Sequence, residues 1–223
     1  MITLLYSYIE KDLHQKLLKD TLNNFPDDFQ YKISQFRRWQ DAQLSLLGRL
    51  LLLRGLSKFN IGTKDIRFVF NAHNKPYLEN TALNFNISHS EDLVVCAFST
   101  EGEIGVDVEL IRNIDVSDFK SQMTLWEWNK IHEATDKTEE FFTYWTQKEA
   151  TLKACGEGLT GIDLTSFHIV NNKAIIKKQQ YLLHEVDISP RYKCHIAIKS
   201  WDHIIKDAEV SLCFLSSNTF CSI

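Results

Sequence analysis

Apolar and polar residues alternate over residues 104–109, which read Ile-Gly-Val-Asp-Val-Glu. A period of two predicts a β-strand with one buried face. Side chains two positions apart in a strand point to the same side, so Asp107 and Glu109 share a face. The pattern therefore predicts a strand that presents two carboxylates together.

A second pattern, with a period near 3.6, predicts a helix over 139–154 that ends at Gly156. Trp145, Glu149 and Lys153 are spaced by four residues and lie along one side of this helix. Glu149 and Lys153 are therefore neighbours on its surface.

The remaining pattern predicts several further elements in chain order. We expect an N-terminal strand, helices over 11–22 and 41–59, helical stretches from 117 onward, and strands over 66–70, 85–87, 93–99, 167–170, 174–176, 193–199 and 209–215. Residues 23–28, 71–77 and 88–92 are expected to be loops or turns, and 171–173 a hairpin turn.

A long helix followed by several strands occurs twice along the chain. This repeat predicts an α+β fold of two similar lobes, residues 1–103 and 104–223, with the active site in a cleft between them. Residues 102–108 would pass between the lobes and place Asp107 and Glu109 at the floor of the cleft. Since one chain supplies both lobes, we expect a monomer.

Composition and charge narrow the class of protein. With 44% hydrophobic and 24% charged residues and a net charge of -4, the chain is typical of a globular protein and not of a general nucleic-acid binder. The N-terminus lacks the features of a signal peptide, and the longest apolar run, 50–53, cannot span a membrane. The five cysteines form no C-x-x-C pair, which favours reduced thiols and a cytoplasmic location.

Asp107, Glu109, Glu149 and Lys153 together indicate chemistry on phosphate. Three carboxylates suit Mg²⁺, and the ammonium suits a phosphate that the metal also touches. Alone, each piece has an ordinary explanation: a strand with acidic residues turned outward, or a surface ion pair worth a few tenths of a kcal/mol. A metal-dependent nuclease is a rival, although the helical spacing and acidic charge count against it. A non-catalytic interaction module is another, with exposed tryptophans such as Trp126 and Trp128 as anchors.

Other polar residues are candidates for ligand contacts. Lys32, Arg37 and Arg38 form a basic cluster, which is either a solvated stretch before a helix or a phosphate site. His89 stands among small polar residues in a predicted turn, where it either lines a cleft or is simply exposed.

Three motifs resemble those of the 4'-phosphopantetheinyl transferases. They are Phe-Asn-Ile-Ser-His-Ser at 85–90, Ile-Gly-Val-Asp-Val-Glu at 104–109, and Trp-Thr-Gln-Lys-Glu-Ala-Thr-Leu-Lys at 145–153 followed by Gly-Glu-Gly-Leu at 156–159. Their order and spacing are similar to the long, pseudo-dimeric type that activates nonribosomal peptide synthetases, the surfactin-synthetase-activating type. The resemblance covers about residues 32–167 and implies two lobes related by a pseudo-twofold axis.

The resemblance implies an activity and a set of roles. The enzyme would transfer the 4'-phosphopantetheine arm of coenzyme A to a serine of an apo acyl or peptidyl carrier protein, releasing adenosine 3',5'-bisphosphate, in nonribosomal peptide, polyketide or fatty acid synthesis. The C-terminal lobe would hold Mg²⁺, which Mn²⁺ can replace, and the N-terminal lobe would bind coenzyme A. By matched position, the metal ligands are Asp107, Glu109 and Glu149, the catalytic residues Glu127, Glu149 and Lys153, and the coenzyme A contacts Lys32, Arg38, Lys75, Ser88, His89 and Lys153.

Two positions depart from the family pattern. Asn74 stands where the family usually has a glycine before Lys75, and asparagine tolerates the same positive φ. Gln35 stands where a second lysine is common, so Arg37 or Arg38 would substitute in holding the 3'-phosphate.

Overall fold

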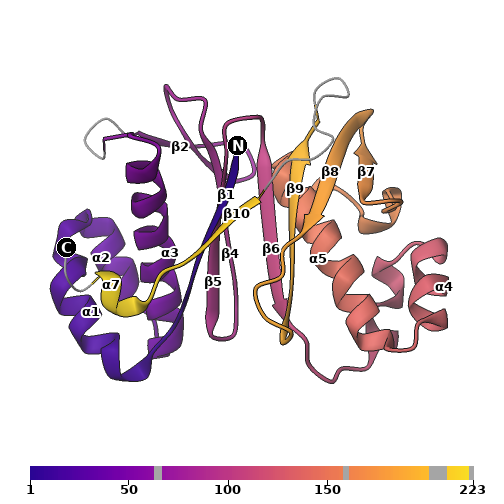
Figure 1. Ribbon diagram of the computed structural model, residues 1–223, viewed down its shortest axis with the longest axis horizontal. Coiled ribbons are helices and arrows are strands. Elements are labelled where there is room, and N and C mark those ends of the chain that lie inside the picture. Colours follow the sequence, from indigo (N-terminus) through magenta and orange to yellow (C-terminus); the bar gives the residue numbers. More distant parts are fainter. Residues whose placement is uncertain (63–66, 158–160, 201–209, 221–223) are drawn as a thin grey trace.

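The computed structural model describes residues 1–62, 67–157, 161–200 and 210–220. Two four-stranded sheets lie between helices in the order helix, sheet, sheet, helix (Figure 1). This arrangement confirms a mixed α+β fold of two domains. Parts of three predictions lie outside the described residues: the start of the strand at 66, the Gly-Leu pair at 158–159, and Glu209.

The first sheet has the strand order β10-β1-β5-β4. Its strands are β1 (Ile2–Tyr8), β4 (Asn84–Ser90), β5 (Leu93–Ser99) and β10 (Val210–Phe214). β5 pairs antiparallel with both β1 and β4, whereas β10 runs parallel to β1. The last described strand, β10, thus belongs to the sheet of the first lobe. The predicted boundary between the lobes at residues 103 and 104 stays a prediction, and the first lobe must also include β10.

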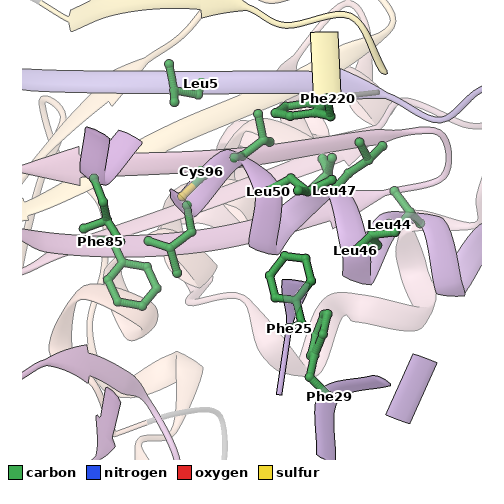
Figure 2. Packing of buried hydrophobic residues seen from close by; sticks show 14 of the residues in the cluster. Leu5, Phe25, Phe29, Leu44, Leu46, Leu47, Leu50, Phe85, Cys96 and Phe220 are labelled. Atoms are coloured by element: carbon green, nitrogen blue, oxygen red, sulfur yellow. The ribbon is translucent and has the colours of Figure 1, made fainter. Parts of the chain in front are cut away.

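Helices cover one face of the first sheet. They are α1 (His14–Thr21), α2 (Asp27–Ser34), α3 (Trp39–Lys58) and the short α7 (Ser217–Phe220), with 3₁₀ turns at Lys11–Leu13 and Leu22–Asn24. Alternate residues of β5, such as Cys96, point to these helices, and Figure 2 shows Cys96 with Leu5, Leu47 and Phe220 in this core. A small hairpin, β2 (Phe68–Phe70) and β3 (Pro76–Leu78), packs beside β4.

The second sheet has the order β6-β9-β8-β7. Its antiparallel strands are β6 (Ile104–Leu110), β7 (Lys173–Ile176), β8 (Gln179–Glu185) and β9 (Tyr192–Lys199). α4 (Leu125–Glu133) and α5 (Lys137–Cys155) cover its outer face, with 3₁₀ turns at Val116–Gln122 and Leu164–Ser166. The inner faces of the two sheets share an apolar core, which includes Leu4, Val95, Val106 and Ile196.

The structure corrects several local predictions. Residues 88–90 were expected in a turn, but they continue β4, and the hairpin turns at Glu91, whose φ is 51°. Residues 167–170 form no strand and contribute only an isolated bridge between Val170 and Lys173. α2 and β8 were not predicted, because their apolar positions are few and flanked by polar residues. The strands near residues 2, 93, 104, 174 and 193, the two long helices and the turn at 171–173 are confirmed.

Candidate functional site

Three residues from three elements meet at the junction of the lobes. Asp107 of β6 is 3% exposed, and its Oδ1 accepts hydrogen bonds from Lys153 Nζ at 2.6 Å and Ser88 Oγ at 3.0 Å. Lys153 Nζ also donates to Ser88 Oγ at 2.9 Å. The structure therefore joins Ser88 of β4, Asp107 of β6 and Lys153 of α5, three residues predicted for one site.

Side chains of β4 link this strand to β6. Asn86 Oδ1 accepts from Val106 N at 2.9 Å, and Ser90 Oγ donates to Glu109 Oε2 at 2.7 Å while it accepts from Leu110 N at 3.1 Å. With Ser88, these residues are spaced by two and face the same side of β4. The roles of Asn86 and Ser90 were missed because residues 88–90 were expected in a turn; as a strand, the same sequence gives this alternation.

Glu149 is the third carboxylate predicted for the site, beside Asp107 and Glu109, and its carboxyl group has no hydrogen-bond partner among the described residues. It is 8% exposed, and its Oε1, like Oδ2 of Asp107, is buried without a hydrogen-bond partner. Burial first, then the charge of Asp107, raises the pKa of Glu149 to about 7, and burial also raises the pKa of Glu109. Carboxylates that repel one another and leave oxygens unsatisfied fit a divalent cation.

The carboxylates are thus of the right chemical type for a divalent cation, but their arrangement in this structure is not that of a formed metal site. Within the described residues, no three His, Cys, Asp or Glu side chains are arranged to hold a metal ion. The ammonium of Lys153 lies beside Asp107, at 2.6 Å from Oδ1. The assignment of Asp107, Glu109 and Glu149 as metal ligands stays a prediction.

The helix that carries Glu149 and Lys153 lies directly on β6. A Cβ on Gly105 would come within 2.1 Å of the carbonyl oxygen of Ala150 and 2.3 Å of the nitrogen of Ala154. Only glycine permits this approach. α5 ends as predicted at Gly156, in a left-handed conformation with φ of 78°.

Lys75 ties the first lobe to the second. Its Nζ donates to the carbonyl oxygens of Ile104 at 3.1 Å and Ala154 at 3.2 Å, and burial lowers its pKa to about 8. Asn71 Nδ2 donates to the carbonyl oxygen of Gly156 at 2.7 Å, and Asn74 has a φ of 62°, as its place in the family motif requires. This loop therefore caps the C-terminal end of α5.

Glu127 lies in a different environment from the Asp107 cluster. Both Glu127 and Lys148 are fully buried, and their side chains pair at 3.0 Å. The two Glu127 oxygens also accept hydrogen bonds from Thr124 N at 2.9 Å and Ile169 N at 3.1 Å. The structure thus gives Glu127 a set of structural contacts and does not bring it to Asp107.

The remaining candidates are exposed. Lys32 lies in the last turn of α2, and Arg38 precedes α3, where it makes a 3.8 Å ion pair with Asp41. His89 is exposed and, as the neighbour of Ser88 in a strand, points to the opposite face of β4. A separate pocket of about 370 Å³ in the second lobe is lined by Ser121, Gln122, Trp145, Ile162, Asp163 and Leu164.

Comparisons with known proteins define the class. Residues 103–213 match the model of the 4'-phosphopantetheinyl transferase superfamily, and residues 14–101 match that of the 4'-phosphopantetheinyl transferase N-terminal region. The chain belongs to the 4'-phosphopantetheinyl transferase superfamily.

Individual relatives bear the same name. The chain is 31% identical to 4'-phosphopantetheinyl transferase gsp of Aneurinibacillus migulanus, over 87% of this chain and 84% of the relative. It is 28% identical to 4'-phosphopantetheinyl transferase Sfp of Bacillus subtilis strain 168, over 73% of each chain. The resemblance drawn from the motifs is confirmed, as is the expected activity, transfer of phosphopantetheine to carrier proteins; the nuclease and interaction-module alternatives fall.

Two further observations bear on the setting of the enzyme. Among the described residues, no helix has the length and apolar character needed to cross a membrane. The four cysteines in the described part of the chain, Cys96, Cys155, Cys194 and Cys213, are free thiols.

Proposed function

We propose that this transferase uses Mg²⁺ to move the 4'-phosphopantetheine arm of coenzyme A to a serine of an apo acyl or peptidyl carrier protein, with release of adenosine 3',5'-bisphosphate. The observation that carries the proposal is the meeting of Ser88, Asp107 and Lys153 beside the unsatisfied oxygen of Glu149. The carriers are those of nonribosomal peptide, polyketide or fatty acid synthesis, and the protein works as a cytoplasmic monomer.

Asp107, Glu109 and Glu149 are the residues that would hold Mg²⁺, or Mn²⁺ in its place. When bound, the cation neutralises charge on the pyrophosphate of coenzyme A. Lys153 is proposed to contact the same pyrophosphate and to stabilise the charge that develops as its bond breaks, and its ion pair with Asp107 supports this role.

Coenzyme A lies along the first lobe. Ser88, His89 and Lys75 are proposed to contact its phosphates, and Lys32 and Arg38 its 3'-phosphate. The exposure of Lys32, Arg38 and His89 supports a role in binding a charged ligand from solvent. Lys75 serves at the lobe junction, where its carbonyl contacts hold the loop against α5.

The family resemblance suggests Glu127 as the group that takes the serine proton, directly or through water. Glu127 is fully buried in its pair with Lys148. We therefore propose a structural role for Glu127, while Glu149 stays a proposed metal ligand.

The order of strands supports the proposed pseudo-twofold relation of the lobes. When the returning strand β10 is left aside, the first strand of each lobe pairs antiparallel with the last, and the last pairs with the strand before it: β1-β5-β4 in one lobe and β6-β9-β8 in the other. In each lobe a long helix, α3 or α5, follows the first strand and covers the outer face of the sheet. The cleft between such lobes is the proposed coenzyme A site.

The deciding experiment is mass spectrometry of an apo carrier protein incubated with this enzyme, coenzyme A and Mg²⁺. We expect a mass gain equal to phosphopantetheine, and none with Asp107→Ala, whose carboxylate is the centre of the cluster. Asp118→Ala, an exposed carboxylate in a 3₁₀ turn, is the matched control and should transfer normally. Wild-type turnover and Mg²⁺ dependence in folded Asp107→Ala would refute the metal assignment.

A further inference from the structure

His195 is a buried polar residue that no role in the reaction has yet used. It lies in β9, directly paired with Asp107 of β6, and is 1% exposed. Directly paired residues of antiparallel strands project to the same face of the sheet. Here that face is covered by α5, since Lys153 of α5 reaches Asp107 and Thr146 of α5 reaches His195.

Two side chains of α5 hold the His195 ring. Nδ1 lies 2.7 Å from Thr146 Oγ1, and Nε2 lies 3.4 Å from Gln147 Nε2. The Thr146 hydroxyl has one hydrogen and lies 2.7 Å from the carbonyl oxygen of Phe142, so we assign that hydrogen to the carbonyl and Nδ1–H of the ring as the donor to Thr146 Oγ1. Nε2 is then the acceptor for the Gln147 amide. Burial lowers the pKa of His195 to about 4, which keeps the ring neutral and this pattern intact at neutral pH.

The hydrogen bonds to His195 bear on the site because Thr146 and Gln147 lie close to Glu149 on α5. Glu149 follows Gln147 by two residues and has no hydrogen bond of its own to Oε1. Its position depends on where α5 lies. The close approach at Gly105 sets the distance between α5 and β6. Polar bonds in fixed directions further restrict the rotation of the helix and its position along its axis. Lys153 and Lys75 supply such bonds near the C-terminal end of α5, and His195 supplies them in the turn that precedes Glu149.

We propose that His195 is a positioning residue, whose hydrogen bonds to Thr146 and Gln147 help fix α5 over β6 and β9 and so set the spacing between Asp107 and Glu149. This inference rests on the proposed function, in which those two carboxylates hold a divalent cation. Groups that orient metal ligands from behind commonly change metal affinity about 10- to 100-fold when removed. His195 acts at one remove further, through the helix that carries Glu149.

The test measures cation binding apart from turnover. Free Mn²⁺ is titrated by electron paramagnetic resonance into the protein with saturating coenzyme A and no carrier. His195→Leu, which keeps bulk but loses both hydrogen bonds, should weaken Mn²⁺ binding about 10-fold or more. His195→Asn should recover much of the affinity, because its amide can donate to Thr146 Oγ1 in place of Nδ1–H.

His184→Leu is the matched control. His184 is a half-buried histidine on the neighbouring strand β8, paired with Ile196 and therefore on the face away from α5. Its replacement should leave Mn²⁺ affinity at the wild-type value whatever it does to stability. An equal loss in His184→Leu would show a general effect of sheet damage and overturn the proposal.

Other outcomes are equally decisive. Folded His195→Leu with wild-type Mn²⁺ affinity refutes the positioning role while the proposed function stands. If His195→Leu does not fold, Thr146→Val and Gln147→Leu each remove one bond to the ring, and unchanged affinity in both also refutes it. If wild-type protein binds no Mn²⁺, the proposed metal chemistry itself fails, and this inference fails with it.

Discussion

At the scale of single residues, the site is built from buried charges that compensate one another unevenly. Asp107 has Lys153 and Ser88 as partners, whereas Glu149 has a buried oxygen with none. An isolated buried carboxylate is costly and tends to stay protonated. A positive charge beside Glu149 would therefore stabilise the ionised form of its carboxyl group.

The raised pKa of Glu149 predicts how stability depends on pH. The carboxyl titrates near 7 in the folded protein and near 4.5 in the unfolded chain, so folding retains a proton between these values. Its contribution is complete below pH 4.5 and is lost as pH rises through 7. Without divalent ions, Glu149→Gln should be more stable than wild type at pH 8 by on the order of 2 to 3 kcal/mol, and equal to it at pH 4.5.

Urea unfolding with EDTA at the two pH values measures this difference. Exposed Glu133→Gln is the control and should show no such trend. Equal unfolding free energies of Glu149→Gln and wild type at pH 8 would contradict the account, as would a gain that appears only at low pH.

Lys153 and Lys32 should differ in the kinetic constant that each controls. Lys153 is proposed to contact the pyrophosphate whose bond breaks, so Lys153→Ala should lower kcat by a factor equivalent to about 3 kcal/mol. Lys32 is exposed and proposed to touch only the 3'-phosphate, a contact that changes little during reaction. Lys32→Ala should therefore raise KM for coenzyme A with kcat nearly intact.

Comparing coenzyme A with its 3'-dephospho form as substrates distinguishes the proposed role of Lys32 from that of Lys153. Lys32→Ala should narrow the preference for coenzyme A, while Lys153→Ala should slow both substrates alike. A preference untouched in Lys32→Ala would mean that the basic cluster is only solvated surface and that Gln35 marks an altered pocket.

At the scale of elements, α5 organises the second lobe. Its inner side carries Lys153 and the bonds to His195, and Gly105 lets it approach β6. Lys148 of the same helix reaches the other way, to Glu127 of α4 and to the carbonyl oxygens of Leu164 at 2.6 Å and Phe167 at 3.0 Å. One helix thus couples the site to the packing of the lobe.

The Glu127–Lys148 pair should act on stability more than on chemistry. Glu127→Gln keeps the size and the acceptor for Thr124 N but leaves Lys148 unpaired in the core, which should cost roughly 3 kcal/mol or more. Glu127→Gln/Lys148→Met removes the stranded charge and should recover part of this loss. Per folded molecule, at a temperature well below unfolding, both variants should keep most of the wild-type kcat.

Denaturant unfolding measures the predicted loss of stability, and single-turnover transfer at low temperature measures whether kcat is kept. A large fall in kcat of Glu127→Gln with an unchanged free energy of unfolding would restore Glu127 as the catalytic base.

At the scale of the whole molecule, the two sheets pack face to face inside a single chain. The shared core of residues such as Leu4, Val95, Val106 and Ile196 buries the inner faces of both sheets, and β10 returns to pair with β1 (Figure 1). Because one chain supplies both sheets and buries their shared core, it does not need a second subunit to complete the site.

We therefore expect a monomer in solution. Sedimentation equilibrium over a range of protein concentrations should give the mass of one chain, 26.0 kDa. An obligate dimer whose boundary contains Asp107 would contradict the proposal that one chain supplies both lobes.

The sequence by itself determined the local elements that have strong periodicity. The alternation at 104–109 and the helical period at 139–154 are properties of neighbouring residues, so the strand, the helix and the positions of Asp107, Glu149 and Lys153 on them follow directly. The three motifs also identified the family, because their order and spacing are features of the chain alone.

The tertiary structure decided which polar side chains meet. Residues 88–90 read as a turn by composition, yet pairing with β5 makes them a strand and aims Ser88 and Ser90 at β6. The pairing of β9 with β6 puts His195 beside Asp107 although 88 positions separate them in the chain. Glu127 matched a catalytic position in sequence, but packing surrounds it with Lys148, Thr124 and Ile169. Such contacts depend on strand register and on the face of each helix that is buried, and neither is set by near neighbours in the sequence.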